Sequence, residues 1–552
     1  MEIYSETRSE QNAPKGRKKS GALKSLSAIF KKFLYSNQKK GKKSEKSVSK
    51  KVLSFFDTET FAKINPLGRN KIEKSVGGAF SKGASSFSGM VKKIKALSPK
   101  KKKLTLLSAG FLFVIICTCI FINYKNSYKK TQNVSNLSDE ELAYLDSILD
   151  ETYTLQRSDG LKPLPYPVNP VDLDVWAGSA ILIDASNGCV IFEKNADAII
   201  PPASITKIFV IYIVLKDIHD GKVSFDDIVP LPEKSWAVNM PSDASLMFLG
   251  QGQIVTLKEL LLGLAVASGN DAAIAVARYI SGGTEEFVAR MNAECAALGL
   301  KNTHFVEPSG YDENNLTCAR DLAKFARIYI NEYPESIDMF HSAKSIRYPL
   351  QKNLPAWQKD LGDSKAVYQK NTNPLLGEME GVDGIKTGFI YESGYNLALT
   401  AKRDGNRFIS ITMQGPGKGS RQGNQGRVHD GHEMMDFAFA SFADYVPSAH
   451  VQTSYTVPVP GGMEKFVRLV PAWDNSITVP RIAGGEKPVD DVQKVQAVVT
   501  VPKSIYGEAV IAKQYGQIQY KLGDIVLETV PLVSDRSVQK GGLWKRFWGL
   551  FV

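Results

Sequence analysis

Two residues that stand three positions apart, Ser204 and Lys207, could act as a nucleophile and its base. They lie in the stretch PPASITKIFV, where two prolines lead into an apolar run that is typical of a buried helix. One turn of helix would place the lysine amine beside the serine hydroxyl. A lysine accepts a proton near neutral pH only when burial or a second cation lowers its pKa. The pair therefore indicates nucleophilic catalysis if the lysine is buried, and an ordinary surface lysine if it is solvated.

Two further motifs offer groups that such a site requires. SGN, which contains Ser268 and Asn270, interrupts an apolar helical pattern and should present a hydroxyl and an amide to a cleft. KTG begins at Lys386 inside GIKTGF, which we expect to be a strand. Each motif is common by chance. Their order and separations, 64 residues from Ser204 to Ser268 and 118 more to Lys386, resemble the arrangement of the class A β-lactamases and penicillin-binding proteins, which implies that the three belong to one site.

The segments that must position these motifs predict one α/β domain over residues 174–446. GSAILID and CVIFEK form an expected β-hairpin near its start, and NLALTAKR and RFISITM form another near its end. Between them, the serine helix should end at Gly221, and two helical pieces should meet at the SGN motif. Strands at both ends with helices between them predict a sheet that mixes early and late strands. Residues 451–536 contain short alternating runs between Gly/Pro turns, which predict a small all-β domain.

Charge divides the chain of 552 residues unevenly. Residues 1–103 hold 27 Lys and Arg against 7 Asp and Glu, whereas the remainder holds 42 against 50. We expect residues 1–103 to be a largely disordered, basic cytoplasmic tail that lies along the membrane, with no nucleic-acid partner.

The stretch from Leu104 to Tyr124 contains 21 residues without a charge, enough to span a bilayer. The basic block before it predicts a single-pass protein of the inner membrane, with the N-terminus in the cytoplasm and the catalytic domain outside. Residues 125–173 should form a stalk with one short helix, Ser138–Gln156, and a proline-rich linker. Residues 541–552 should form an amphipathic segment at the membrane interface.

Longer stretches around the motifs resemble the low-molecular-mass penicillin-binding proteins, the serine-type D-Ala-D-Ala carboxypeptidases of peptidoglycan. SAILIDASNGCVIFEKNADAIIPPASITKIF and GVDGIKTGFIYESGYNLALTAKRDG carry much of this resemblance, which covers Trp176 to Tyr445. It implies a β-lactamase/transpeptidase-like domain, in which helices cover both sides of an antiparallel sheet. The β-rich segment and the aromatic end are similar to the second domain and the membrane-associating tail of the same family. The basic tail and internal anchor depart from the family pattern.

The resemblance also implies the role of each catalytic group. Ser204 would attack the carbonyl between two D-alanines, and Lys207 would take its proton. Ser268 would relay a proton to the leaving D-alanine, and Asn270 would orient Lys207 and the substrate. The positive charge of Lys386 would help to keep Lys207 neutral.

The implied substrate-binding residues lie mainly on the KTG strand. The terminal carboxylate would be held by Thr387 and by Arg427, which we place in a long Gly-rich loop. The substrate would add to the edge of the strand that contains Gly388, and backbone N–H groups of Ser204 and Phe389 would bind the oxyanion. The full set of substrate-binding residues is Lys386, Thr387, Gly388, Phe389 and Arg427. Ile390 stands where the family often has threonine.

No cofactor or metal is implied; the expected ligands are the peptidoglycan stem peptide and β-lactam inhibitors. His429 and His432 lack a third metal ligand at recognisable spacing. A β-lactamase would need a carboxylate that activates water, which ENNLT from Glu313 could supply, but Gly269 stands where that class has aspartate. An inactive scaffold protein would need a broken motif, and none is broken. A DD-endopeptidase acting on cross-linked muropeptides would use the same residues as a carboxypeptidase, so both activities remain open.

Overall fold

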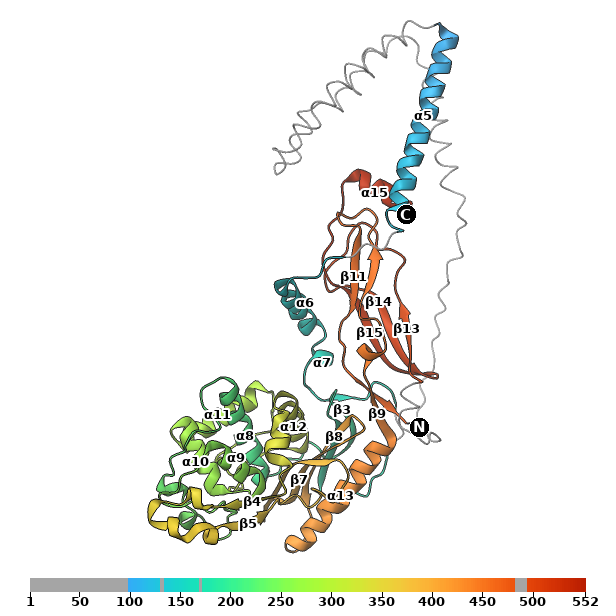
Figure 1. Ribbon diagram of the computed structural model, residues 1–552. Coiled ribbons are helices and arrows are strands. Elements are labelled where there is room, and N and C mark those ends of the chain that lie inside the picture. Colours follow the sequence, from blue (N-terminus) through green and yellow to red (C-terminus); the bar gives the residue numbers. More distant parts are fainter. Residues whose placement is uncertain (1–97, 130–133, 168–170, 482–493) are drawn as a thin grey trace. The chain divides into compact units, whose positions relative to one another are not determined.

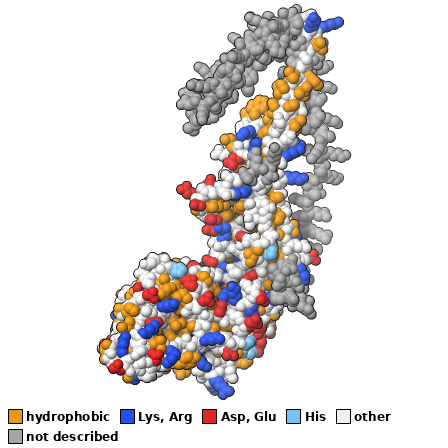
Figure 2. Space-filling model, in the orientation of Figure 1, with side chains coloured by type: hydrophobic (Ala, Val, Ile, Leu, Met, Phe, Trp, Pro, Cys, Tyr) orange, Lys and Arg blue, Asp and Glu red, His pale blue; other side chains and the backbone are white. Residues whose placement is uncertain are grey.

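The computed structural model describes residues 98–129, 134–167, 171–481 and 494–552 (Figure 1). The described residues divide between two units, with the boundary after Cys119. Up to residue 97 the predicted basic tail lies outside the described residues, so its disorder there stays a prediction, whereas its last five residues, 99–103, are helical and not disordered as expected. The predicted anchor lies within helix α5 (Pro99–Asn126), along which exposed apolar side chains follow one another (Figure 2). Among the described residues, no helix meets the combined length and apolarity that crossing a bilayer demands.

A six-stranded sheet forms the centre of the catalytic domain, with strand order β1-β3-β2-β8-β7-β6. All neighbours are antiparallel except the short β1, which is parallel to β3. The hairpins β2–β3 and β7–β8 are those predicted from the sequence, and β2 pairs with β8, so early and late strands mix as expected. The strands are β1 (Lys162–Pro163), β2 (Ser179–Asp184), β3 (Cys189–Lys194), β6 (Val382–Ile390), β7 (Gly394–Arg403) and β8 (Asn406–Gly415).

Helices cover both faces of this sheet, which confirms the expected fold. Side chains alternate along β2: Ile181 and Ile183 pack into one apolar cluster with the helices that precede β6, whereas Ala180 and Leu182 pack into a second cluster with α13. The helices of the first cluster are α8 (Lys207–His219), α9 (Leu257–Val266), α10 (Asn270–Ser281), α11 (Thr284–Ala297) and α12 (Ala319–Glu332). α13 (Ser420–Ser441) covers the other face, and a small hairpin is formed by β4 (Ser345–Tyr348) and β5 (Val367–Lys370).

The all-β segment after residue 446 is a five-stranded antiparallel sheet of order β10-β11-β15-β14-β13. Its strands are β10 (Tyr455–Pro458), β11 (Phe466–Pro471), β13 (Gln496–Thr500), β14 (Gln514–Leu522) and β15 (Ile525–Ser534), while β12 (Ile477–Pro480) pairs with β9 (Phe442–Tyr445).

The predicted stalk helix is present as α6 (Asp139–Thr152), capped by Ser138, and is followed by the short α7 (Thr154–Arg157). Rather than standing free, α6 packs its buried Leu145 and Leu149 into the apolar cluster of the β-sheet. The C-terminal α15 (Leu543–Gly549) exposes Leu543 and Trp544.

Candidate active site

Ser204 lies in a single 3₁₀ turn, η1 (Ala203–Thr206), and Lys207 begins helix α8 directly after it. The Lys207 side chain is fully buried, as the apolar sequence around it requires. Its Nζ atom lies 2.8 Å from Ser204 Oγ, 2.8 Å from Asn270 Oδ1 and 2.5 Å from the Ser309 carbonyl oxygen. The structure thus brings together Ser204, Lys207 and Asn270, three of the four predicted catalytic residues.

These three contacts determine how a neutral Lys207 must be oriented. A neutral amine has two N–H groups and one lone pair, and the oxygens of Asn270 and Ser309 can only accept hydrogen bonds. The two N–H groups therefore bind those oxygens, and the lone pair is left facing the Ser204 hydroxyl. In this state the hydroxyl donates to the amine, which is the starting geometry for removal of its proton.

Burial lowers the pKa of Lys207 from 10.5 to about 7. The negative charges of Glu307 and Asp271 oppose this shift and keep the pKa from falling further. The sequence left two causes open for a lowered lysine pKa, burial and a second cation. The structure supplies burial, and the charge of Lys386 is not needed to explain the lowered pKa of Lys207. At neutral pH, a substantial fraction of Lys207 is a free base.

The SGN motif forms the sharp turn between α9 and α10, as its interruption of the helical pattern predicted. Asn270 is the first residue of α10, and the Asp271 carboxylate beside it accepts the backbone N–H groups of Met247 and Leu249 at 2.8 and 2.9 Å. Ser268 has a left-handed backbone with φ of 58°, an uncommon conformation for serine. Its side chain is buried but, in the described structure, makes no hydrogen bond to Ser204 or Lys207.

The KTG motif lies in β6, as expected, and β6 is the edge strand beside the serine turn. Lys386 is fully buried, donates to the Thr387 carbonyl at 3.0 Å, and has a pKa far below its ordinary value. Burial is the main cause, followed by the positive charges of Lys207 and Arg427. The Thr387 hydroxyl donates to Thr372 Oγ1 at 2.6 Å.

Gly388 is required by the close approach of β6 to the serine turn. A Cβ atom at this position would lie 2.4 Å from the Pro202 carbonyl oxygen and 3.2 Å from the Ala203 Cβ. No side chain fits there without displacement of backbone. The third residue of the motif therefore sets the distance between the nucleophile and the strand that we expect to bind substrate.

Arg427 lies on helix α13, which begins at Ser420, so the prediction that it belongs to a long loop is wrong. Within this helix Gly423 packs directly against the Tyr395 ring, which leaves no room for a Cβ atom at that position. The Arg427 guanidinium is buried and donates to the backbone carbonyl oxygens of Gly388 at 2.5 Å and Asn396 at 3.0 Å. Burial lowers its pKa to about 10. Its visible role is to hold the KTG strand and its neighbour β7.

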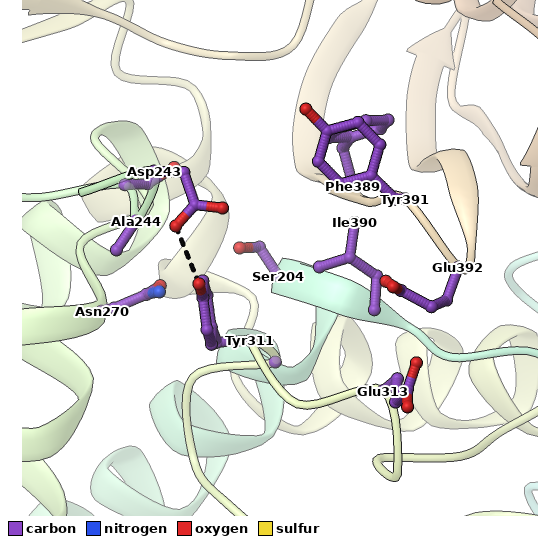
Figure 3. Close-up of a pocket in the computed structure, with 12 residues that line it drawn as sticks. Ser204, Asp243, Ala244, Asn270, Tyr311, Glu313, Phe389, Ile390, Tyr391 and Glu392 are labelled. Atoms are coloured by element: carbon purple, nitrogen blue, oxygen red, sulfur yellow. Dashed lines mark hydrogen bonds between the residues drawn. The ribbon is translucent and has the colours of Figure 1, made fainter. Parts of the chain in front are cut away.

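A cavity of about 350 Å³ opens in front of Ser204 (Figure 3). Tyr311 donates to Asp243 Oδ1 at 2.7 Å on one side of Ser204, and Phe389 and Tyr391 lie on the other. Glu313 also lines the cavity. The complete lining consists of Ser204, Asp243, Ala244, Ser245, Asn270, Gly310, Tyr311, Glu313, Phe389, Ile390, Tyr391 and Glu392.

Sequence reasoning did not identify the residues that hold the catalytic groups in place. Glu307, Asp271 and Ser309 act through backbone N–H and C=O groups, for which the sequence carries no motif. The two histidines considered for metal binding have separate partners. The His429 ring stacks on the Trp176 ring with 3.9 Å between their centroids, and His432 Nδ1 lies 3.0 Å from Asp436 Oδ2. Within the described ranges, no three potential metal ligands lie together.

Comparisons with known proteins agree with this arrangement. The family model of D-alanyl-D-alanine carboxypeptidases matches residues 167–417, and that of the penicillin-binding protein 5 C-terminal domain matches residues 448–540. The D-alanyl-D-alanine carboxypeptidase DacF of Bacillus subtilis is 31% identical over 367 residues, which are 66% of this chain and 87% of the relative. The crystal structure of penicillin-binding protein 5 from Haemophilus influenzae matches with a TM-score of 0.56 and 29% identity, covering 68% of this chain and 100% of that one. A D-alanyl-D-alanine endopeptidase of Pseudomonas aeruginosa is 30% identical over 247 residues, 43% of this chain and 71% of the relative.

Proposed function

Because the chain belongs to the D-alanyl-D-alanine carboxypeptidase family of low-molecular-mass penicillin-binding proteins, we propose that it removes the terminal D-alanine from peptidoglycan stem pentapeptides. The observation that carries the proposal is the environment of Lys207: two carbonyl acceptors occupy its N–H groups and turn its lone pair toward Ser204. This geometry equips a serine for nucleophilic attack without a histidine.

The reaction proceeds through an acyl-enzyme. Ser204 Oγ attacks the carbonyl carbon of the penultimate D-alanine while its proton passes to Lys207, and the oxyanion is bound by the backbone N–H groups of Ser204 and Phe389. The C–N bond then breaks, and the leaving D-alanine takes a proton that returns from Lys207, with Ser268 as the relay. Water then attacks the ester and loses a proton to Lys207, and as the ester C–O bond breaks Lys207 returns that proton to Ser204 Oγ, which frees the enzyme and the shortened peptide.

Substrate binding rests on the KTG strand. The peptide adds to the exposed edge of β6, and its terminal carboxylate is bound at Thr387 and Lys386. Arg427 supports this carboxylate site by holding the Gly388 carbonyl, and we also propose a direct contact between its remaining N–H groups and the carboxylate. β-Lactams occupy the same place, because their ring amide and carboxylate imitate the D-Ala-D-Ala terminus.

The test of this proposal is labelling by fluorescent penicillin. The wild-type protein should be labelled at Ser204, and Ser204→Ala should not be. Labelling that survives this substitution would assign the nucleophile to another residue. Incubation with a stem pentapeptide should release D-alanine, identified by mass.

DD-Endopeptidase activity is the second candidate, because the Pseudomonas aeruginosa relative carries that name. Both activities use the same acylation step, and they differ in whether the leaving group is a free D-alanine or a cross-linked one. Cross-linked muropeptides incubated with the enzyme separate the two, since endopeptidase cleavage halves the dimer and carboxypeptidase cleavage leaves it linked.

We further propose that the enzyme is a single-pass protein of the inner membrane and that its catalytic domain faces the peptidoglycan. The uncharged stretch Leu104–Tyr124 and the basic block before it support this orientation. The exposed aromatic residues of α15 would add a weaker interfacial contact. Protease added outside spheroplasts should digest the chain after about residue 125 and spare the basic tail; the reverse pattern would overturn the orientation.

A further inference from the structure

Glu307 lies in the loop between α11 and α12, and its carboxylate is the centre around which that loop folds. Oε2 accepts the Ser309 backbone N–H at 2.7 Å and the Ser309 hydroxyl at 2.6 Å. Oε1 accepts the backbone N–H groups of Gly310 and of Tyr311, the latter at 2.9 Å, and the Asn315 side-chain amide at 2.9 Å. Five donors therefore converge on one carboxylate, an arrangement that only a charged side chain with two acceptor oxygens can satisfy.

The loop that Glu307 organises presses against the catalytic turn. The Ser309 carbonyl oxygen accepts from Lys207 Nζ at 2.5 Å, so it is one of the two acceptors that orient the amine. Gly310 has a φ of 78°, and a Cβ there would lie 1.9 Å from the Ala203 carbonyl oxygen. The position of the Ser309 carbonyl is thus fixed from one side by Glu307 and from the other by the serine turn.

Glu307 also acts on Lys207 through its charge. Ionisable groups interact with the Lys207 amine from three elements: Glu307 from this loop, Asp271 from α10 and Lys386 from β6, and Arg427 of α13 acts in turn on Lys386. Of the two carboxylates, Glu307 has the stronger influence on the pKa of Lys207 and raises it against the effect of burial. Glu307 therefore combines an effect on the pKa of Lys207 with a hold on the loop that carries the Ser309 acceptor.

We propose that Glu307 is a positioning residue of the acylation step: it holds the Ser309 carbonyl against Lys207, and its negative charge sets the lower pH limit at which Lys207 can act as the base. The inference rests on the proposed role of Lys207 in activating Ser204. It assigns a function to a residue that belongs to none of the three sequence motifs and does not line the cavity.

The experiment measures the second-order rate of labelling by fluorescent penicillin across the pH range for the full-length wild type, Glu307→Gln and Glu307→Asp. The rate should rise with pH as Lys207 loses its proton. In Glu307→Gln the charge is gone, so the rise, measured as the pH at which the labelling rate reaches half of its plateau, should move to lower pH by roughly one unit. The plateau rate should fall, because the amide offers one acceptor oxygen in place of two. Glu307→Asp withdraws the carboxylate by one methylene and should move the rise in the same direction by less.

Two further variants separate charge from loop structure. Ser309→Ala removes the hydroxyl that binds Glu307 but keeps the carbonyl and the charge, so the plateau should fall while the rise stays at the wild-type pH. Glu285→Gln, on the exposed first turn of α11, should change neither. Thermal unfolding identifies which variants are folded, and Glu307→Asp carries the test alone if Glu307→Gln does not fold.

The outcomes discriminate clearly. A rise that stays at the wild-type pH in every folded Glu307 variant, even with a lower plateau, would show that Glu307 only stabilises the loop and would overturn the proposal. If the rise moves by the same amount in Ser309→Ala, the proposal is also overturned, because the shift would then come from a less rigid Ser309 loop and not from the lost charge. Absence of labelling in the wild type would instead contradict the proposed function itself.

Discussion

Replacement of Lys207 by arginine isolates the contribution of a free amine. Arginine keeps the positive charge and much of the length, but its guanidinium does not lose its proton in proteins. The structure lowers the pKa of Lys207 from 10.5 to about 7, so the amine is neutral in about half of the molecules at pH 7. A lysine in water would be neutral in roughly one molecule in 3000 at that pH. Lys207→Arg should therefore reduce the acylation rate by at least about 10³-fold, equivalent to about 4 kcal/mol in the barrier.

The assay is the second-order rate of penicillin acylation at neutral pH, with D-alanine release from a pentapeptide as a second measurement. Lys216→Arg is the matched control, because Lys216 lies on the same helix and forms an ion pair with Glu294 at 2.8 Å that arginine can keep. The control should retain the wild-type rate. If Lys207→Arg stays folded and its rate lies within about tenfold of wild type, another group accepts the Ser204 proton and the geometric argument is refuted.

Two more perturbations test the supporting structure. Gly388→Ala would place a Cβ 2.4 Å from the Pro202 carbonyl oxygen, so β6 must move away from the serine turn; penicillin acylation should fall at least about tenfold, and an unchanged rate would mean that this spacing is not critical. His341 is buried, its Nδ1–H donates to the Ile385 carbonyl at 3.0 Å, and burial lowers its pKa from 6.5 to about 4. The unfolded chain binds this proton at a higher pH than the folded chain does. The contribution of the neutral His341 to the free energy of unfolding should therefore be fully present above about pH 6.5, and the free energy of unfolding should decline by about 3 kcal/mol as the pH falls to about 4. Urea unfolding of His341→Gln should show a correspondingly weaker pH dependence in that window than wild type, and an identical dependence would contradict the assignment.

The sequence predicted the elements that carry the motifs because their patterns are local. The break between α9 and α10 at SGN, the strand that contains KTG and the hairpin β7–β8 all follow from periodicity and turn residues. Arg427 was misplaced because glycines such as Gly423 suggest a loop, whereas in the fold Gly423 packs on the Tyr395 ring within a helix. That contact joins distant segments, so local pattern could not reveal it.

The same limit explains why the motif residues were found and the groups that position them were not. A nucleophile, a base and an amide are recognisable by residue type, but the Ser309 carbonyl is a backbone group that every residue possesses. Its importance arises because Ser309, which lies 102 residues after Lys207 in the sequence, is folded back against the Lys207 amine. Glu307 stabilises that loop through five donors on four residues, all within eight positions of it, so its local contacts resemble those of an ordinary turn residue.

The two buried lysines impose a further constraint on how the site can work. Lys207 and Lys386 are both fully buried, and the charge of Lys207 is one cause of the low pKa of Lys386. Two positive charges that influence each other in a buried site are costly, so transfer of the Ser204 proton to Lys207 disfavours a charged Lys386 unless an anion is present. The carboxylate of the substrate is such an anion. A ligand that brings its own negative charge to the KTG strand therefore creates the conditions in which Lys207 can hold the serine proton, which favours substrates and inhibitors that end in a carboxylate.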